Sequence, residues 1–336
     1  MEIVLTGITT TGTPHIGNYV GAIRPAVAAS WREGVGSYYF LADYHSLVKG
    51  SNPDQVARST LEIAASWLAA GLNPKSVFYR QSDVPEITEL AWILTCMTAK
   101  GLMNRAHAYK AAVDENAARG NRDPDQGITM GLFCYPILMA ADILMFKAHK
   151  VPVGKDQIQH VEMARDIAAR FNHHFGETFV LPEAQVGDAS AVLPGLDGRK
   201  MLKSYDNTIP LFVDAKKLRK LIMKIKTNSL EPGEPKDPDD SALFAIYRAF
   251  ATEDEATQMR QRYADGIGWG EMKQLLFEYV NAHLEGPRVE YQRLLAAPDH
   301  VEQVLREGAE RARGVSRPFL DEIRKAVGIR SLSSLP

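Results

Sequence analysis

Short apolar runs alternate with longer stretches of helical periodicity through the first half of the chain. The runs are residues 3–5, 37–41, 77–79 and 151–153. Between them lie longer stretches such as 53–70 and 85–99, where apolar residues recur at the spacing of one helix face. Strands separated by helices are typical of a parallel sheet, because each parallel pair needs a long crossover. The pattern therefore predicts an α/β fold, a Rossmann-like parallel sheet with helices on both faces.

The second half of the chain has a different pattern, almost wholly helical from Leu211 onward. An acidic, proline-rich piece at 231–240 interrupts it and predicts a loop. The expected helices are 242–251, 254–263, 269–284, 288–296 and 301–327. We therefore expect two domains, 1–205 around the sheet and 206–336 made of helices. Within the first, the small, charged and Gly/Pro-punctuated stretch 111–126 predicts a flexible surface loop.

Composition fits a globular protein of about two domains: 336 residues, 45% hydrophobic and 24% charged. A net charge of −2 excludes a protein that holds nucleic acid by overall positive charge, although a local basic face remains open. Cys96 and Cys134 lack the spacing of a metal site and indicate a reducing compartment. The N-terminus lacks the features of a signal peptide, and Asp142 interrupts the longest apolar run. We therefore expect a cytoplasmic protein with no membrane span and no metal motif.

Two polar segments are candidate phosphate sites. In the first, the strand at 3–5 leads through the turn 9–14 into His15-Ile16-Gly17-Asn18, which directs free backbone N–H groups and a positive helix end toward an anion. The second is Lys200-Met201-Leu202-Lys203-Ser204, after the Gly-rich turn 195–199. Two lysines three residues apart can bind neighbouring phosphates whose charge grows as pyrophosphate leaves. Helix capping and a solvated lysine loop are the simpler alternatives, but the two segments together favour nucleotide chemistry.

A pocket wall is expected on the helix 135–146. Tyr135, Met139 and Asp142 are spaced so that all three point the same way. A carboxylate on an apolar helix face is unfavourable to bury without a partner. Either a nearby Arg or Lys pairs with Asp142, or Asp142 accepts a hydrogen bond from an aromatic N–H or O–H of a ligand. His45, which follows a predicted strand, is either a second cleft residue or an ordinary core histidine.

Two further segments carry weaker signals. Gly154-Lys155-Asp156-Gln157 follows a buried strand and opens a helix, a pattern that capping alone also explains. One predicted helix carries a basic run, formed by Lys216, Lys217, Arg219, Lys220, Lys224 and Lys226. Such a run is either a solvated face or a contact surface for nucleic-acid phosphates.

These segments together resemble the class I aminoacyl-tRNA synthetases, whose paired signatures are written HIGH and KMSKS, and in particular the bacterial tryptophan-specific family. The likeness covers essentially the whole chain. It rests on 9–18, 43–46, 135–142, 151–157, 165–172 and 200–204. Two departures stand out: Thr9-Thr10-Thr11 replaces the family's more usual Gln-Pro-Ser, and Leu202 replaces a small polar residue.

The resemblance implies an enzyme that activates L-tryptophan with ATP and Mg²⁺ and transfers it to tRNA(Trp). The implied catalytic residues are His15, Asn18, Lys200 and Lys203. The implied ATP-binding residues are Thr9, Thr10, Thr11, Gly17, Asn18, Gly154, Lys155, Asp156, Lys200, Met201, Leu202, Lys203 and Ser204. The implied tryptophan-binding residues are Asp142, Tyr135, Met139, Gln157 and His45.

The resemblance also implies a homodimer whose helical domain reads the tRNA anticodon and whose last helix packs back on the catalytic domain, with Lys216 and Lys220 as candidate tRNA contacts. A tyrosine-specific enzyme of the same fold is the nearest alternative. It would carry a tyrosine in the first strand, where this chain has Leu5. A small-molecule nucleotidylyltransferase and a non-catalytic paralogue are further alternatives. A nucleotidylyltransferase would have no use for the helical half. The retained Lys200 and Lys203 argue against a non-catalytic paralogue.

Overall fold

The structure, a computed structural model, describes residues 1–50, 52–186 and 192–334. Its described residues form one sheet of five parallel strands in the order β3-β2-β1-β4-β5. The strands are β1 (Glu2–Thr9), β2 (Val35–Ala42), β3 (Val77–Arg80), β4 (Lys150–Pro152) and β5 (Glu183–Gln185). The four predicted strands are confirmed. The edge strand β5 was not predicted, because it is short and largely exposed and so has no apolar run.

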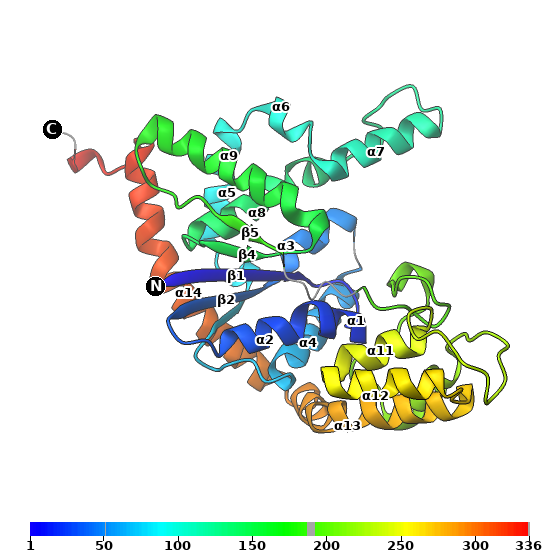
Figure 1. The fold of residues 1–336 in the computed structure, drawn as a ribbon. Helices are drawn as coiled ribbons and strands as arrows, with labels where there is room; N and C mark the ends of the chain where they lie inside the picture. Colours follow the sequence, from blue (N-terminus) through cyan, green and yellow to red (C-terminus); the bar gives the residue numbers. More distant parts are fainter. Residues whose placement is uncertain (51, 187–191, 335–336) are drawn as a thin grey trace.

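Helices cover both faces of the sheet, which confirms the predicted fold class (Figure 1). The helices α2 (Arg24–Ser30) and α4 (Pro53–Ala69) lie on one face. The other face is covered by α5 (Glu86–Met97), α8 (Met130–Met145) and α9 (Ile158–Phe175). Strand β2 shows why: Tyr39 and Leu41 belong to one hydrophobic core, whereas Tyr38 and Phe40 belong to the other. A strand buried on both faces reads as a continuous apolar run, as 37–41 does.

Short helical segments connect these elements, several of them at the strand ends. They are α1 (Ile16–Asn18), a π-helical turn (Tyr19–Ile23), α3 (Asp43–Ser46), α6 (Lys100–Met103) and α7 (His107–Ala118), with 3-10 turns at Leu47–Lys49, Gln81–Asp83, Lys155–Gln157, Lys203–Tyr205 and Leu332–Ser334. The predicted loop at 111–126 is wrong in its first half, because α7 continues to Ala118. The alanines of this stretch favour helix more strongly than its charges oppose it. Asn116 then holds the following turn by donating to the carbonyls of Pro124 and Gln126, both at 2.9 Å.

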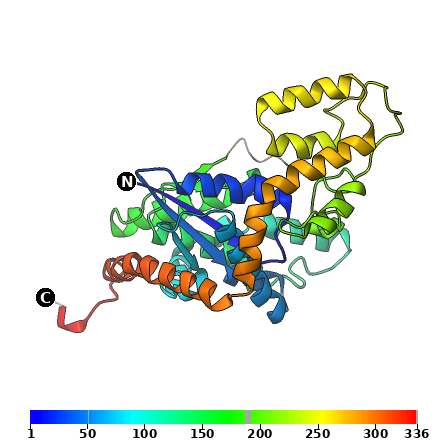
Figure 2. The same cartoon turned by 90° about the horizontal axis from the view of Figure 1, so that it is seen from below.

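The C-terminal half forms a helical lobe and a long final helix (Figure 2). Its helices are α10 (Ala215–Met223), α11 (Ala242–Phe250), α12 (Glu253–Ala264), α13 (Trp269–Leu295) and α14 (Pro298–Ala326). Two of the predicted helices are in fact one, because α13 continues through Pro287. A proline costs one backbone hydrogen bond and bends a helix, but tertiary packing holds the two halves together. The predicted basic helix is also shorter than expected, ending at Met223 before Lys224 and Lys226.

The final helix α14 runs along the edge strand β3 and caps that side of the sheet (Figure 2). Gly308 makes this approach possible, since a Cβ there would lie 1.7 Å from the carbonyl oxygen of Phe78. Ion pairs add to the contact: Arg80 with Glu302 at 3.1 Å, and Arg313 with Glu86 at 2.9 Å. The helix therefore closes an edge that would otherwise be open for strand pairing.

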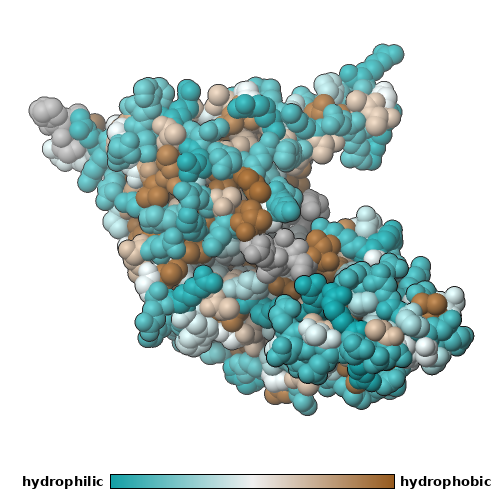
Figure 3. Space-filling model, in the orientation of Figure 1, coloured by the Kyte–Doolittle hydropathy of each residue, from teal (hydrophilic) through white to brown (hydrophobic). Residues whose placement is uncertain are grey.

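The surface in Figure 3 is mostly hydrophilic, with separate apolar patches. Its outline is indented between the projecting α7 end and the lobe of α11 and α12 (Figures 1 and 3). Among the described helices, none is both long and apolar enough to cross a membrane.

Candidate active site

A cavity of about 620 Å³ opens at the carboxyl ends of β1 and β4. These strands lie at the point where the strand order reverses, which is where open α/β sheets bind ligands. The cavity wall is mainly apolar. It includes Leu5, Phe40, Leu132, Met139, Ile143 and Val151. Gly7 on β1 also lines the cavity, and a Cβ at this position would lie 2.5 Å from the ring of Phe40. The absence of that Cβ lets the ring lie across the strand and form part of the wall.

Asp142 lies on α8, fully buried at the wall of this cavity. Its Oδ2 atom is 2.9 Å from Nε2 of His45, and Nε2 of Gln81 donates to both of its oxygens at 2.8 and 3.0 Å. Burial raises the pKa of Asp142, while the hydrogen bond from His45 opposes that rise. The alternative of an Arg or Lys partner is therefore wrong, since a histidine and a glutamine hold the carboxylate instead.

The carboxylate of Asp142 keeps room for one more donor. Two carboxylate oxygens offer about four lone-pair sites, and the contacts from Gln81 and His45 occupy three of them. Tyr135 and Met139, from the same helix, line the same cavity, as does His45. The structure thus gathers these predicted pocket residues with Asp142 in one mainly apolar cavity.

Tyr135 also takes part in a hydrogen-bond chain below the cavity wall. Its hydroxyl is 2.7 Å from Nε2 of His160, and Nδ1 of His160 is 3.0 Å from Oε1 of Gln157. Gln157 lines the cavity, and its Nε2 atom donates to Asp156 at 2.9 Å. Buried His160 therefore links two residues predicted to bind the amino acid.

His15 and Asn18 form a reciprocal cap at the start of α1. The backbone N–H of Asn18 donates to Nδ1 of His15 at 3.3 Å, and the backbone N–H of His15 donates to Oδ1 of Asn18 at 3.1 Å. Burial, and then the charge of Lys203, lower the pKa of His15 to about 4. The imidazole is therefore neutral at pH 7. Because its Nδ1 accepts, the ring hydrogen resides on Nε2, which is left as a donor.

Gly17 has a different immediate neighbour from the one the sequence indicates. The resemblance implies that Gly17 contacts ATP. In the structure, a Cβ at Gly17 would lie 3.0 Å from Nδ1 and 3.1 Å from Cε1 of His15. The absence of a side chain at Gly17 therefore makes room for the His15 ring. A contact between Gly17 and ATP remains a prediction.

The three threonines before this turn do not act alike. Thr9 and Thr11 line the cavity, whereas Thr10 is buried and its hydroxyl lies 2.7 Å from that of Ser46. The hydroxyl of Thr10 is thus engaged in the protein interior. Gly12 follows with a φ of +67°, a left-handed conformation that favours glycine, and its N–H donates to Ser59 at 2.8 Å.

The lysine loop reaches this threonine turn across the cleft. The ammonium of Lys203 donates to the carbonyl oxygen of Thr11. It also lies next to Gly12, where a Cβ would be 3.2 Å from Nζ. Loss of solvent lowers the pKa of Lys203. Lys200 and Ser204 are exposed on the same loop. Lys203 is thereby held beside the first candidate phosphate site, at Thr11, which is 192 residues away along the chain.

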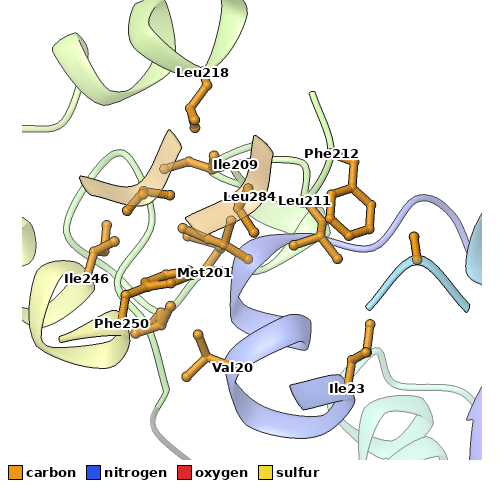
Figure 4. Packing of buried hydrophobic residues seen from close by; sticks show 14 of the residues in the cluster. Val20, Ile23, Met201, Ile209, Leu211, Phe212, Leu218, Ile246, Phe250 and Leu284 are labelled. Atoms are coloured by element: carbon orange, nitrogen blue, oxygen red, sulfur yellow. The ribbon is translucent and has the colours of Figure 1, made fainter. Parts of the chain in front are cut away.

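Met201, between the two lysines, points into the protein (Figure 4). It is 3% exposed and packs in the hydrophobic core that contains Val20 and Phe250. Its side chain therefore anchors the loop, and any contact with ATP is left to the backbone. Backbone pairing strengthens the anchor, because Ile16 donates to Ile209 and Leu211 donates to Pro14, both at 3.0 Å.

Asn207 organises the loop from within. Its Oδ1 atom accepts from the backbone N–H of Leu202 at 2.9 Å, while its Nδ2 atom donates to the carbonyl of Lys200 at 3.0 Å and to Asp197 at 2.8 Å. Gly195 has no Cβ at this point, where one would lie 2.3 Å from the Asn207 side chain. Hydrogen bonds from Asn207 and Arg199 lower the pKa of Asp197 to about 2. One buried amide therefore sets the backbone path between the two lysines.

Asn207→Ala is expected to lower the rate of nucleotide chemistry without changing amino-acid affinity, since the loop residues lose three hydrogen bonds. Leaving partly buried hydrogen-bond partners unpaired costs about 1–3 kcal/mol, or roughly 5- to 150-fold. Single-turnover kinetics and equilibrium binding measure the two effects separately. Asn104→Ala, an exposed change at the end of α6, serves as the matched control and should alter neither. Equal losses of rate and affinity would contradict this role.

The remaining predicted residues fall into two groups. Gly154 lines the cavity, and Lys155 and Asp156 lie exposed at its rim in the turn before α9. A Cβ on Gly154 would lie 2.7 Å from the Asp156 carboxylate, so glycine lets that carboxylate fold over the turn. Lys216 and Lys220 are exposed on α10, along a shallow basic groove outside the cavity.

Sequence reasoning missed three residues of the site: Gln81, His160 and Asn207. Gln81 directly follows β3, so a polar residue at the carboxyl end of a strand was the available signal. His160 lies three residues after Gln157 on an apolar helix face. Asn207 has no local signal, because its partners define its role.

The chain is similar to known proteins over nearly its whole length. The model of the family described as tRNA synthetases class I (W and Y) matches residues 2–285. The tryptophan–tRNA ligase of Pseudomonas aeruginosa is 60% identical over 333 residues, covering 98% of this chain and 74% of that protein. The tryptophan–tRNA ligase of Neisseria meningitidis is 59% identical, with 98% of both chains covered. A solved structure, tryptophanyl-tRNA synthetase from Campylobacter jejuni complexed with ADP and tryptophan, is 43% identical, with a TM-score of 0.86 over 97% of this chain and 99% of that chain.

Proposed function

The chain belongs to the class I tRNA synthetases for tryptophan and tyrosine, and we propose that it is a tryptophan–tRNA ligase whose aminoacyl-adenylate forms in the cavity at the β1–β4 switch point. The observation that carries the choice of amino acid is the buried Asp142 carboxylate, which keeps one acceptor site toward an apolar pocket. An indole N–H needs only an acceptor there. The first strand contributes Leu5 to the pocket, where a tyrosine hydroxyl would need a polar partner.

The proposed reaction has two steps. In the first, the carboxylate of tryptophan attacks the α-phosphorus of ATP, the bond to the bridging oxygen breaks, and pyrophosphate leaves. In the second, a hydroxyl of the terminal tRNA ribose attacks the acyl carbon and AMP leaves. The protein contributes position and charge, with Nε2–H of His15 and the ammonium of Lys203 as donors toward the phosphates. Asn18 holds the His15 ring through the cap, and Lys200 adds a second positive charge.

Mg²⁺ is part of the proposal as an ion that arrives with ATP. The described residues contain no cluster of three or more His, Cys, Asp or Glu side chains suited to a metal. The phosphate oxygens and water would therefore supply its ligands, and the ion would neutralise charge on the departing pyrophosphate.

For the tRNA, we propose that the helical part, 206–336, reads the anticodon and that α10 meets the RNA backbone. The exposed face of α10 and the residues just beyond it are strongly basic. The basic residues there are Lys216, Lys217, Arg219, Lys220 and Lys224. Leu218 and Ile222 are buried on the opposite face of α10, so the lysine side chains face solvent. A basic face of this kind suits phosphate contacts.

Lys216→Glu combined with Lys220→Glu is expected to weaken tRNA binding and to flatten its salt dependence. Each lost phosphate contact lowers the slope of log affinity against log salt by roughly 0.7–0.9. Binding titrations at several salt concentrations measure the slope, and tRNA-independent exchange should survive. Lys75→Glu with Lys325→Glu makes the same charge change at exposed positions elsewhere. Slopes that match the native chain would show that α10 carries an ordinary solvated face.

We further propose a cytoplasmic homodimer. The dimer rests on the family resemblance, whereas the cytoplasmic location rests on the two cysteines, whose spacing indicates a reducing compartment. Sedimentation of the purified chain at several concentrations tests the dimer.

The decisive experiment for the proposed function is amino-acid-dependent ATP–pyrophosphate exchange, run in parallel with tryptophan and with tyrosine. Exchange with tryptophan and little or none with tyrosine is expected, followed by charging of tRNA(Trp). Preference for tyrosine would overturn the choice of substrate, and no exchange with either would overturn the assignment to a catalytic enzyme.

A further inference from the structure

His160 lies outside the cavity wall but joins two residues that line it. The ring sits on α9 and is 2% exposed. Its Nε2 atom is 2.7 Å from the hydroxyl of Tyr135, and its Nδ1 atom is 3.0 Å from Oε1 of Gln157. Both ring nitrogens are thus engaged, so the position of the ring hydrogen decides what each neighbour can offer to a ligand.

The direction of these hydrogen bonds follows from the contact between Gln157 and Asp156. The carboxylate of Asp156 accepts from Gln157 at 2.9 Å, which identifies the contacting atom of Gln157 as its NH₂ nitrogen. The other end of that amide is therefore its oxygen. Since an amide oxygen only accepts, Nδ1 of His160 carries a hydrogen and donates to it.

The same reasoning continues to Tyr135. Burial lowers the pKa of His160, and the charge of His107 adds to that effect, so the ring is neutral at pH 7. A neutral imidazole with its hydrogen on Nδ1 has a bare Nε2. The hydroxyl of Tyr135 must therefore donate to His160. Burial also raises the pKa of Tyr135, so the hydroxyl keeps that hydrogen.

We propose that His160 is a positioning residue that turns Tyr135 and Gln157 into acceptors toward the cavity, and thereby recognises the α-ammonium group of the amino-acid substrate. With its hydrogen committed to His160, the Tyr135 oxygen keeps only lone pairs for a ligand. The amide oxygen of Gln157 has a second lone pair free of His160. Two acceptors that line one cavity suit a cation with several N–H donors. This inference rests on the proposed function, because the substrate must be an amino acid.

The test compares two ligands that differ only in the ammonium group: tryptophan and indole-3-propionate, which lacks it. His160→Phe keeps a ring but frees the Tyr135 hydroxyl to point its hydrogen into the cavity. Tryptophan affinity, measured by calorimetry, is expected to fall roughly 10-fold or more, whereas the affinity for indole-3-propionate stays within about 2-fold. His283→Phe, an exposed histidine change on α13, is the matched control and should alter neither affinity.

A double-variant comparison checks that His160 acts through Tyr135. Tyr135→Phe alone should lower the ratio of tryptophan affinity to indole-3-propionate affinity. Adding His160→Phe should lower it further by less than His160→Phe does alone, because only the effect through Gln157 remains. Equal loss for both ligands, or fully additive losses in the double variant, would overturn the inference. Should His160→Phe fail to fold, His160→Leu carries the same ligand comparison, because its side chain also lacks a hydrogen-bonding atom. Exchange by the native chain tests the proposed function separately, so the two failures are distinguishable.

Discussion

Lys203→Ala is expected to slow adenylate formation by roughly 30- to 900-fold, about 2–4 kcal/mol, while tryptophan affinity stays nearly unchanged. The ammonium of Lys203 already lies beside the threonine turn, where it donates to the carbonyl of Thr11 and is partly desolvated. A positive charge held there interacts more strongly with the departing pyrophosphate than with the phosphates of bound ATP, because additional negative charge develops on the leaving group as the bond breaks. The effect should therefore appear in the rate constant of the bound state.

Single-turnover kinetics at saturating ATP and tryptophan measure that rate constant, and calorimetry measures the affinity. Lys75→Ala removes the same side chain at an exposed site before β3 and serves as the control. Lys203→Arg keeps the charge and should fall between the native chain and the alanine variant. Loss of tryptophan binding with a preserved bound-state rate would show that Lys203 supports the pocket and does not act on the phosphates.

Asp142→Asn is expected to lower tryptophan use by roughly 10- to 200-fold, since a charge-assisted hydrogen bond in a dry pocket contributes about 1.5–3 kcal/mol. The structure sharpens this expectation. Gln81 and His45 both donate to the native carboxylate. An amide at this position has only one acceptor atom, so its NH₂ group must face either one of these donors or the indole N–H. Each orientation sets two donors against each other.

The ligand comparison for Asp142 uses tryptophan and β-(3-benzothienyl)alanine, in which sulfur replaces the ring N–H. The native chain should use the analogue poorly, and Asp142→Asn should reduce its use much less than that of tryptophan. Asp166→Asn makes the same chemical change at an exposed site on α9 and should affect neither. Equal losses for the two ligands, or a large fall in the midpoint of thermal unfolding, would mean that Asp142 stabilises the protein and does not read the indole.

The sequence was sufficient for the fold class because the signals for it are local. Residues 37–41 form an apolar run of the kind that is typical of a strand buried on both faces, and the structure confirms this strand as β2. The same local signals failed at Pro287 and at 111–118. At Pro287, packing along α13 outweighs the lost backbone hydrogen bond. At 111–118, the helix propensity of the alanines outweighs the opposing effect of the charges.

In the candidate site, too, local sequence signals and tertiary contacts determined different things. The sequence by itself determined the candidate segments: the turn before His15, the Asp142 helix, the Gly154 turn and the lysine loop are each recognisable from residue type and spacing. Only the tertiary structure decided which residues those segments meet. Gln81 comes to Asp142 across 61 residues, and Lys203 comes to Thr11 across 192. Hydrogen-bond partners so far apart leave no periodic trace in the chain, so pairing, burial and the position of each proton emerge only when the sheet and its helices are packed together.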